Sequence, residues 1–118
     1  MTKTSEIRLR VDMDDDGIDR IRWDADDGPA PGEQVAKAMI LALWDADKRN
    51  ALRIDLWTKD LSVDDMNDFF FQTLLSMAET YRNATNDVNL MTEIQLFARD
   101  FADKAARAAG AQGRAPGS

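Results

Sequence analysis

The chain has 118 residues, enough for one domain with a modest core, and 44% of them are hydrophobic. Its net charge of −7 argues against non-specific binding of nucleic acid or docking to an anionic membrane surface. It contains neither cysteine nor histidine, which excludes disulfides, thiolate metal sites and catalysis by Ser–His or Cys–His pairs.

The N-terminal segment predicts a β-hairpin, because apolar and charged residues alternate on both sides of the acidic turn at residues 14–17. A three-residue loop with Gly17 at positive φ gives a consistent pairing of the two strands. One outer-face pair in this register, Arg10 opposite Arg22, is unfavourable because the charges are alike. The predicted register pairs Val11 with Ile21 and Leu9 with Trp23 on the inner face, and Asp12 with Arg20, Arg8 with Asp24 and Arg10 with Arg22 on the outer face.

The same turn also begins like an EF-hand calcium loop, since residues 12–17 spell D-x-D-x-D-G. The similarity ends there, because Asp19 takes the place of an apolar residue and Trp23 that of the bidentate glutamate. The flanking segments are also predicted strands, whereas an EF-hand has helices. We therefore interpret this segment as an acidic turn, with weak calcium binding as the alternative, and expect no cofactor.

Residues 26–32 contain two prolines and two glycines and predict a loop. Between Glu33 and Asp47 the apolar residues recur at helical spacing, so a helix is predicted here. This helix would connect the hairpin to a third strand. One stripe of the predicted helix contains Val35, Met39, Ala42, Leu43 and Ala46.

Residues 51–57 alternate with a period of two and predict a strand that buries Leu52, Ile54 and Leu56. Ser62 then predicts the N-cap of a helix that continues to about Tyr81. Its first turn carries acidic side chains that suit the positive end of the helix dipole. The three phenylalanines at 69–71 cannot all face one core, and Phe71 is expected to be partly exposed or packed on the last helix.

A second long helix is predicted after a polar segment at residues 82–87, in which Thr85, Asn86 or Asp87 caps the new helix. Together the two helices should form an αα-hairpin. From Gly110 onward the sequence has no apolar periodicity, and residues 110–118 are expected to be a flexible tail. The apolar seam of the second helix contains Leu90, Ile94, Phe97, Phe101 and Ala105.

The predicted fold class is α+β, in the order ββαβαα, with a small three-stranded sheet covered by helices on one face. Residues 3–109 are expected to form a single domain. The open face of the sheet would combine arginines with a tryptophan, the residue types enriched in binding hot spots. A plain solvated face is the more common arrangement and the first interpretation, with a binding surface as the second and a Trp57 buried under the helices as a further alternative. The candidate protein-binding residues are Arg8, Arg10, Arg20, Arg22, Arg53 and Trp57.

The segment at residues 52–60, LRIDLWTKD, is followed by Met66-Asn67, Phe69-Phe70 and Gln72-Thr73-Leu74. In these residues the chain resembles the GldC family of gliding-motility proteins, and the similarity extends over about residues 3–104. Phe71 stands where the family is expected to carry histidine. The resemblance implies a role in motility but assigns no activity, cofactor or catalytic residue.

An enzyme is not expected, since no Gly-rich phosphate loop, zinc-ligand spacing or nucleophile motif occurs. No membrane-spanning run and no signal peptide are found, so a cytoplasmic location and no membrane insertion are expected. The expected partners are proteins rather than nucleic acid, and homo-oligomerisation stays open. Two functions remain: an accessory module or adaptor of the motility apparatus, or a chaperone-like acidic protein that holds a hydrophobic segment.

Overall fold

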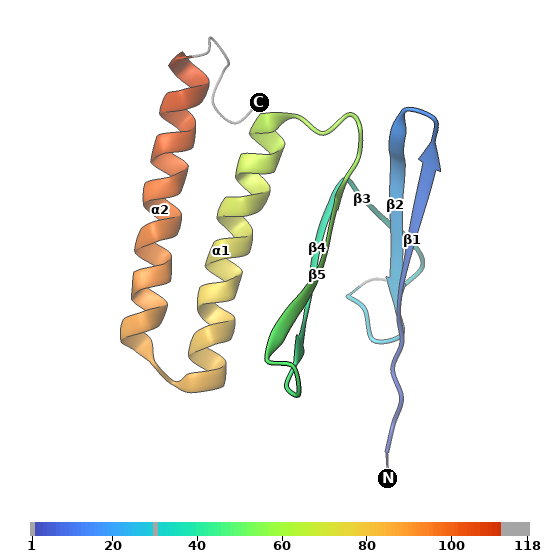
Figure 1. Ribbon diagram of the computed structural model, residues 1–118, viewed down its shortest axis with the longest axis horizontal. Coiled ribbons are helices and arrows are strands. Elements are labelled where there is room, and N and C mark those ends of the chain that lie inside the picture. Colours follow the sequence, from blue (N-terminus) through green and yellow to red (C-terminus); the bar gives the residue numbers. More distant parts are fainter. Residues whose placement is uncertain (1, 30, 112–118) are drawn as a thin grey trace. The chain divides into compact units, whose positions relative to one another are not determined.

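The structure is a computed structural model that describes residues 2–29 and 31–111. The described residues form two compact units, one ending at Leu61 and one beginning at Ser62, and each is described by itself. The first unit contains only strands and the second only helices (Figure 1). In chain order the elements are β1 (Ile7–Asp14), β2 (Gly17–Ala25), β3 (Gln34–Ala36), β4 (Ala38–Asp45), β5 (Asn50–Trp57), α1 (Val63–Thr85) and α2 (Val88–Ala111).

The first three strands form an antiparallel sheet in the order β1-β2-β3. All five cross-strand pairs predicted for the hairpin are confirmed, including Arg10 opposite Arg22. The predicted three-residue loop is wrong, because the register shifts after Asp12, leaves Asp19 as an extra residue and pairs Asp14 with Gly17. Gly17 has a φ of 137°, which an L side chain rarely adopts. The centre of the inner face is Ile21, which is only 1% exposed.

The helix predicted between residues 33 and 47 is wrong, because this segment forms the strands β3 and β4. A short apolar run such as AMILALW fits a helix or a strand equally well by periodicity. The decisive feature is the turn that follows it. The side chain of Asp45 accepts hydrogen bonds from the backbone N–H groups of Asp47 and Lys48, at 3.0 and 3.1 Å, and Arg49 adopts a positive φ of 51°. These features reverse the chain into β5.

β4 and β5 form a separate antiparallel sheet of two strands, here called the ribbon. The predicted single three-stranded sheet and the order ββαβαα are therefore wrong, although the fold is α+β. The predicted strand at 51–57 is confirmed, and its alternation creates an apolar face and a mixed face. The apolar face carries the cross-strand pairs Met39–Leu56, Leu41–Ile54 and Leu43–Leu52, and the mixed face carries Ala38–Trp57, Ile40–Asp55, Ala42–Arg53 and Trp44–Ala51.

The second unit begins at the predicted N-cap. The side-chain oxygen of Ser62 accepts a hydrogen bond from the backbone N–H of Asp65 at 3.0 Å, which satisfies one free donor of the first turn. α1 ends at Thr85, four residues later than predicted, and Asn86 closes it with a φ of 60°. Asp87 caps the second helix by accepting from the N–H of Leu90 at 2.9 Å.

The two helices pack as an αα-hairpin around small residues. Ala78, Ala98 and Ala109 are almost completely buried, which lets the backbones approach closely. The rings of Phe70 and Phe101 lie 6.2 Å apart between centroids. α2 includes Gly110 and Ala111, and residues 112–118 of the predicted tail lie outside the described residues. The single domain expected over residues 3–109 stays a prediction.

Candidate protein-interaction surfaces

Four of the candidate arginines lie on one face of the three-stranded sheet. The register places Arg8 and Arg10 of β1 on the same face as Arg20 and Arg22 of β2. Each of these guanidinium groups is within 3.2 Å of a carboxylate oxygen. The charged network contains the pairs Arg8–Glu6, Arg8–Asp24, Arg8–Asp26, Arg10–Asp24, Arg10–Glu33, Arg20–Asp12, Arg22–Asp12 and Arg22–Glu33.

Glu33 resolves the unfavourable arginine pair that the sequence predicts. It precedes β3 and lies two residues before Val35, which is opposite Arg22 in the sheet. Because side chains two residues apart share a face, Glu33 reaches the same surface as the arginines. One of its carboxylate oxygens lies 3.2 Å from Arg10 and 3.2 Å from Arg22. The like charges therefore share one counter-ion, which the sequence analysis missed because it assigned Glu33 to a helix.

The network favours the charged forms of Asp12, Arg22 and Asp24. The hydrogen bonds that Arg22 donates to Asp12 lower the pKa of Asp12 and raise the pKa of Arg22. Desolvation acts to raise the pKa of Asp24, but the hydrogen bonds from Arg8 and Arg10 outweigh it, so this pKa is lowered. These arginines already have acidic partners within the chain.

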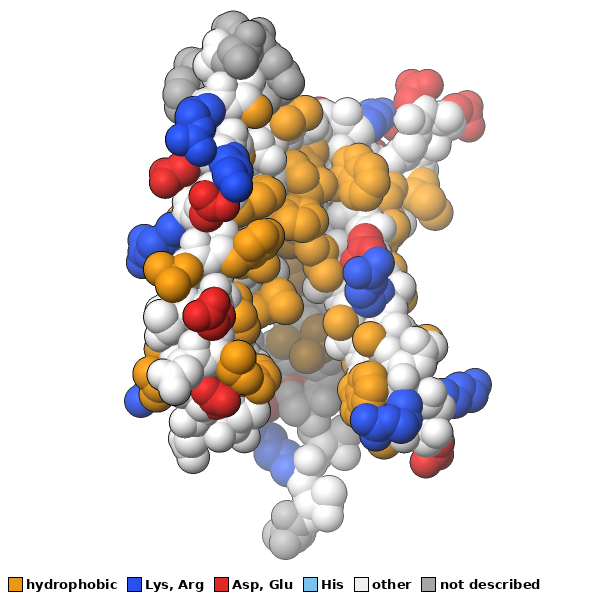
Figure 2. Space-filling view, turned by 60° about the vertical axis from the view of Figure 1, so that its left-hand side comes forward, with side chains coloured by type: hydrophobic (Ala, Val, Ile, Leu, Met, Phe, Trp, Pro, Cys, Tyr) orange, Lys and Arg blue, Asp and Glu red, His pale blue; other side chains and the backbone are white. Residues whose placement is uncertain are grey.

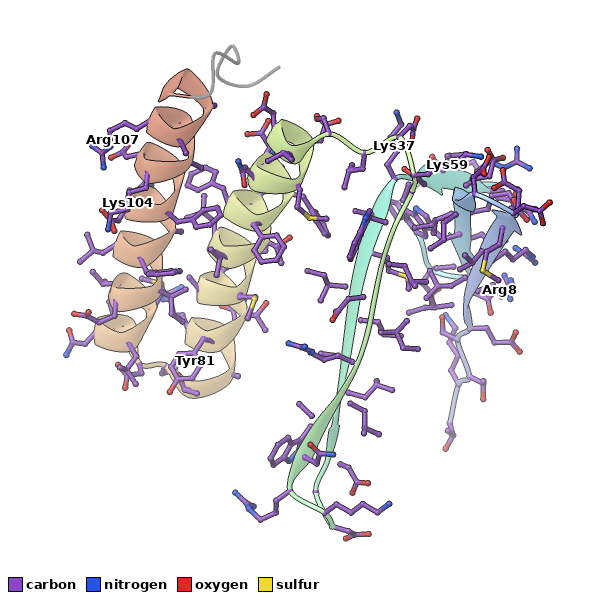
Figure 3. All side chains as sticks on the ribbon, turned by 45° about the horizontal axis from the view of Figure 1, so that its top comes forward. Arg8, Lys37, Lys59, Tyr81, Lys104 and Arg107 are labelled. Carbon is purple, nitrogen blue, oxygen red and sulfur yellow. The ribbon has the colours of Figure 1, made fainter. Side chains whose placement is uncertain are left out.

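The segment Thr58-Lys59-Asp60 joins the ribbon to the three-stranded sheet. The N–H of Thr58 donates to the carbonyl of Lys37 at 2.8 Å, and the N–H of Lys59 donates to the carbonyl of Ile18 at 2.9 Å. Thr58 is 2% exposed and its hydroxyl donates to Asp60 at 2.7 Å, while Lys37 contacts the same carboxylate at 3.2 Å. Figure 3 shows Lys37 and Lys59 close together at this junction. The end of the LRIDLWTKD segment thus has a structural role.

The acidic turn is part of the same junction. The ammonium group of Lys59 contacts the carboxylate of Asp14, which also accepts from the N–H of Asp16 at 2.9 Å. These hydrogen bonds lower the pKa of Asp14, and the one that Lys59 donates to Asp14 also raises the pKa of Lys59. Asp12, the first residue of the EF-hand-like pattern, pairs with arginines. Among residues 2–29 and 31–111, no group of three or more acidic side chains could hold a metal ion.

The structure separates the two other candidate residues from the four arginines. Arg53 and Trp57 lie on the mixed face of the ribbon, in the other sheet. Trp57 is 56% exposed, and Arg53 contacts only the neighbouring Asp55, at 3.5 Å, among its described ion pairs. A second tryptophan, Trp44, shares this face and is 60% exposed, with the guanidinium of Arg49 5.6 Å from its ring centroid. The sequence does not place Trp44 on this face, because its segment is predicted to be a helix.

The apolar face of the ribbon is also exposed toward its tip. Leu43, Leu52 and Ile54 each leave between 50% and 60% of their surface accessible. Alternation in β5 predicted a buried face for this strand, and for Leu52 and Ile54 that prediction is wrong. Exposed apolar patches of this kind mark surfaces that bind other proteins.

The helical unit exposes apolar side chains as well, visible over the helices in Figure 2. Phe97, which belongs to the apolar seam predicted for the second helix, is 58% exposed, and Met77 of α1 is 55% exposed. Phe70 is more exposed than Phe69 and Phe71. Phe71 lines a shallow hollow between α1 and α2, which agrees with the predicted alternative that it packs on the last helix. The hollow is lined by Asp64, Asn67, Asp68, Phe71, Ala102, Ala105, Ala106 and Ala109.

Neither described helix is long and apolar enough to cross a membrane. Comparison with curated proteins and with solved structures gave no match. Comparison with family models gave a match to gliding motility-associated protein GldC-like over residues 18–107, which include β2 from its second residue, β3, β4, β5, all of α1 and most of α2. Because this match spans most of the chain, the protein belongs to the GldC-like family of gliding motility-associated proteins.

Proposed function

We propose that this protein is a non-enzymatic cytoplasmic module that binds another protein, and that it acts as an accessory or adaptor of the gliding-motility apparatus. Membership of the GldC-like family supports the link to motility. The absence of histidine and cysteine from the sequence removes the usual catalytic bases and nucleophiles and supports a binding role.

The observation that carries this proposal is the exposure of the ribbon. A two-stranded sheet is marginally stable by itself, yet this one presents large apolar and aromatic side chains to solvent on both faces. Soluble proteins rarely expose such contiguous surface unless another molecule covers it. Tryptophan is among the residues that contribute most to protein–protein binding.

The mixed face of the ribbon supplies the most suitable anchor. Trp57 and Arg53 are four residues apart on one strand and therefore share this face. The arginines of the three-stranded sheet pair with carboxylates of the same chain, whereas the ion pair of Arg53 among residues 2–29 and 31–111 is the longer 3.5 Å contact with Asp55. We therefore place partner binding at Arg53 and Trp57, with Arg8, Arg10, Arg20 and Arg22 as outlying contacts.

We expect Trp57→Ala and Arg53→Glu to abolish partner binding while the fold persists. Both side chains are exposed, so their loss removes little packing within the chain. The test is affinity purification of each tagged variant from a gliding bacterium, followed by quantitative mass spectrometry of the retained proteins. Circular dichroism checks that each variant is folded.

Matched controls come from exposed positions outside the ribbon. Ile7→Ala removes a side chain that is 74% exposed at the start of β1, and Arg107→Glu reverses a charge on α2. Figure 3 shows Lys104 and Arg107 pointing away from α1. Both controls should retain the partner. A folded Trp57→Ala protein that binds as well as the wild type would exclude the ribbon as the binding surface.

The second candidate is a chaperone-like protein that holds a hydrophobic segment of a client. The apolar side chains exposed on the helical unit favour it, since they offer a second surface that does not depend on one anchor. An acidic chain also stays soluble while exposing such surface. The same purification separates the candidates: one dominant partner supports the adaptor, and a broad set of apolar clients supports the chaperone.

A further inference from the structure

We propose that two copies of this chain associate through the free edge of β5 and join their ribbons into one four-stranded antiparallel sheet. Among the described residues, β5 pairs with β4 along one edge only (Figure 1). This association goes beyond the partner binding proposed above, because it uses the backbone edge of the strand and a second copy of the same chain.

The edge of β5 has few of the features that usually protect an edge strand, with Arg53 and Asp55 as its only charged residues. Its eight residues follow a regular register, without a bulge, and include neither proline nor lysine. Natural proteins protect exposed edges with such residues because an unprotected edge pairs with other strands. By contrast β1, at the edge of the other sheet, has a register irregularity and four charged residues.

The sequence of β5 is complementary to itself about a two-fold axis at Ile54. Arg53 of one copy then lies opposite Asp55 of the second copy, and the same pair recurs across the axis. Opposite charges in such positions stabilise a sheet, and like charges destabilise it. Moving the axis by one residue places Arg53 opposite Arg53, or Asp55 opposite Asp55. The charges therefore select one register.

Side-chain size and polarity agree with this register. On the apolar face, Ile54 meets Ile54 and Leu52 meets Leu56 of the second copy, so the two half-exposed residues gain apolar neighbours. On the mixed face, Trp57 has Ala38 on one side within its own ribbon and gains Ala51 of the second copy on the other. Small residues on both sides leave room for the indole. A half-register shift would instead place the apolar face of one ribbon beside the mixed face of the other.

The edge of β4 does not offer this selectivity. Its only charged residue is Asp45, at the end of the strand, so no ion pair fixes a register for two copies of β4. Self-pairing of β4 could slide by two residues without a change in charge pairing. For this reason we assign the contact to β5.

Cysteine crosslinking tests the position of the axis, because the natural chain contains no cysteine. Residues directly opposite in an antiparallel sheet lie about 4.5 to 5.5 Å apart between Cα atoms, within the range of a disulfide. Ile54→Cys should therefore form a covalent dimer under mild oxidation. Leu52→Cys is the matched control, because its two copies would lie roughly 13 Å apart along the strands and should not crosslink.

Charge reversal tests the register independently. Arg53→Asp and Asp55→Arg should each weaken the dimer on the order of tenfold, because each creates two like-charge pairs across the axis. Mixing the two variants should restore a heterodimer, in which every aspartate lies opposite an arginine. The contact between residues 53 and 55 within each chain is not restored by mixing, so recovery reports pairing between chains. Sedimentation equilibrium measures all three samples.

Several results would overturn the proposal. One is a wild-type chain that stays monomeric at its highest soluble concentration. Another is a Leu52→Cys protein that crosslinks as fast as Ile54→Cys. A third is equally fast crosslinking of Leu41→Cys, which lies in β4 and would indicate contact through the edge of that strand. Absence of a heterodimer in the mixed sample would also overturn it. If Ile54→Cys fails to fold by circular dichroism, the charge variants decide alone. Purified protein suffices for these measurements, so their failure is distinct from the loss of a cellular partner.

Discussion

At the scale of single residues, the three-stranded sheet depends on one glutamate whose role only the fold reveals. Arg10 and Arg22 lie directly opposite each other, and Glu33 reaches both from the start of the third strand. A carboxylate shared by two guanidinium groups removes the repulsion that their pairing would otherwise cause. The sequence predicts the unfavourable pair correctly but does not show its counter-ion, because Glu33 directly precedes β3 and local patterning assigns it to a helix.

We predict that Glu33→Gln lowers the melting temperature at low ionic strength and that added salt reduces this deficit. The substitution removes the counter-ion that Arg10 and Arg22 share and leaves each with its separate aspartate, Asp24 or Asp12. Their mutual repulsion is then less compensated, and salt screens such exposed charges over about 8 to 10 Å. Thermal unfolding followed by circular dichroism at low and high salt measures the effect. Glu93→Gln, at an exposed position on α2, should behave as the wild type. A salt-independent deficit would mean that Glu33 acts by packing and not by charge.

At the scale of elements, the accuracy of sequence analysis depends on whether local signals specify one structure. The five pairs predicted between β1 and β2 are correct, because the alternation and two of the three outer-face charge pairs favour that register, whereas the turn beyond Asp12 differs from the prediction. β4 is missed, because alanine, leucine and methionine suit helices and its apolar run has no unambiguous period. A strand of this composition is specified by its pairing with β5. A short stretch of sequence around β4 does not contain this partner, so local patterns cannot predict the strand.

The candidate site shows the same division. Sequence analysis finds Arg53 and Trp57 on a common strand face, which the structure confirms. It places four further arginines beside them, but these lie in the other sheet and are paired with acids. The error follows from the assumption that all strands share one sheet. Trp44 is missing from the candidate binding residues for a related reason, since its segment is predicted to be a helix.

The start of α1 is predicted correctly from its capping residue, and substitution of Ser62 tests how much this cap contributes to stability. We expect Ser62→Ala to destabilise the protein by about 1 kcal/mol without changing the fold, because it removes the acceptor for the N–H of Asp65. Denaturant unfolding measures the change as a shifted midpoint with an unchanged slope. Ser76→Ala, in the middle of α1 and exposed, is the matched control and should not destabilise. An unchanged midpoint for Ser62→Ala would show that the cap contributes nothing to stability.

At the scale of the whole molecule, the chain combines 22 acidic with 15 basic residues, and its described arginine network uses acids as structural partners. Arg22 lowers the pKa of Asp12, Lys59 lowers that of Asp14, and Arg8 lowers that of Asp26. A carboxylate with a lower pKa in the folded state than in the unfolded state favours folding when it is ionised. Because these groups are distributed over the first unit and its junction, the stability of this unit should depend on pH as a whole.

We therefore predict acid lability with a defined sign. Above the unfolded-state aspartate pKa of about 3.9, the contribution of these ion pairs is fully present. As the pH falls below that value the unfolded chain binds protons first, so stability decreases, and the contribution is lost once the pH passes below the folded-state pKa values. Asp12→Asn should lower the melting temperature at pH 7, and its difference from the wild type should narrow in acid, because the wild-type group is then protonated too. Asp103→Asn on α2, which is exposed, serves as the control. Thermal melts from neutral to strongly acidic pH measure the difference in melting temperature between Asp12→Asn and the wild type. If this difference stays constant through the range, the ion pairs of Asp12 do not couple protonation to folding.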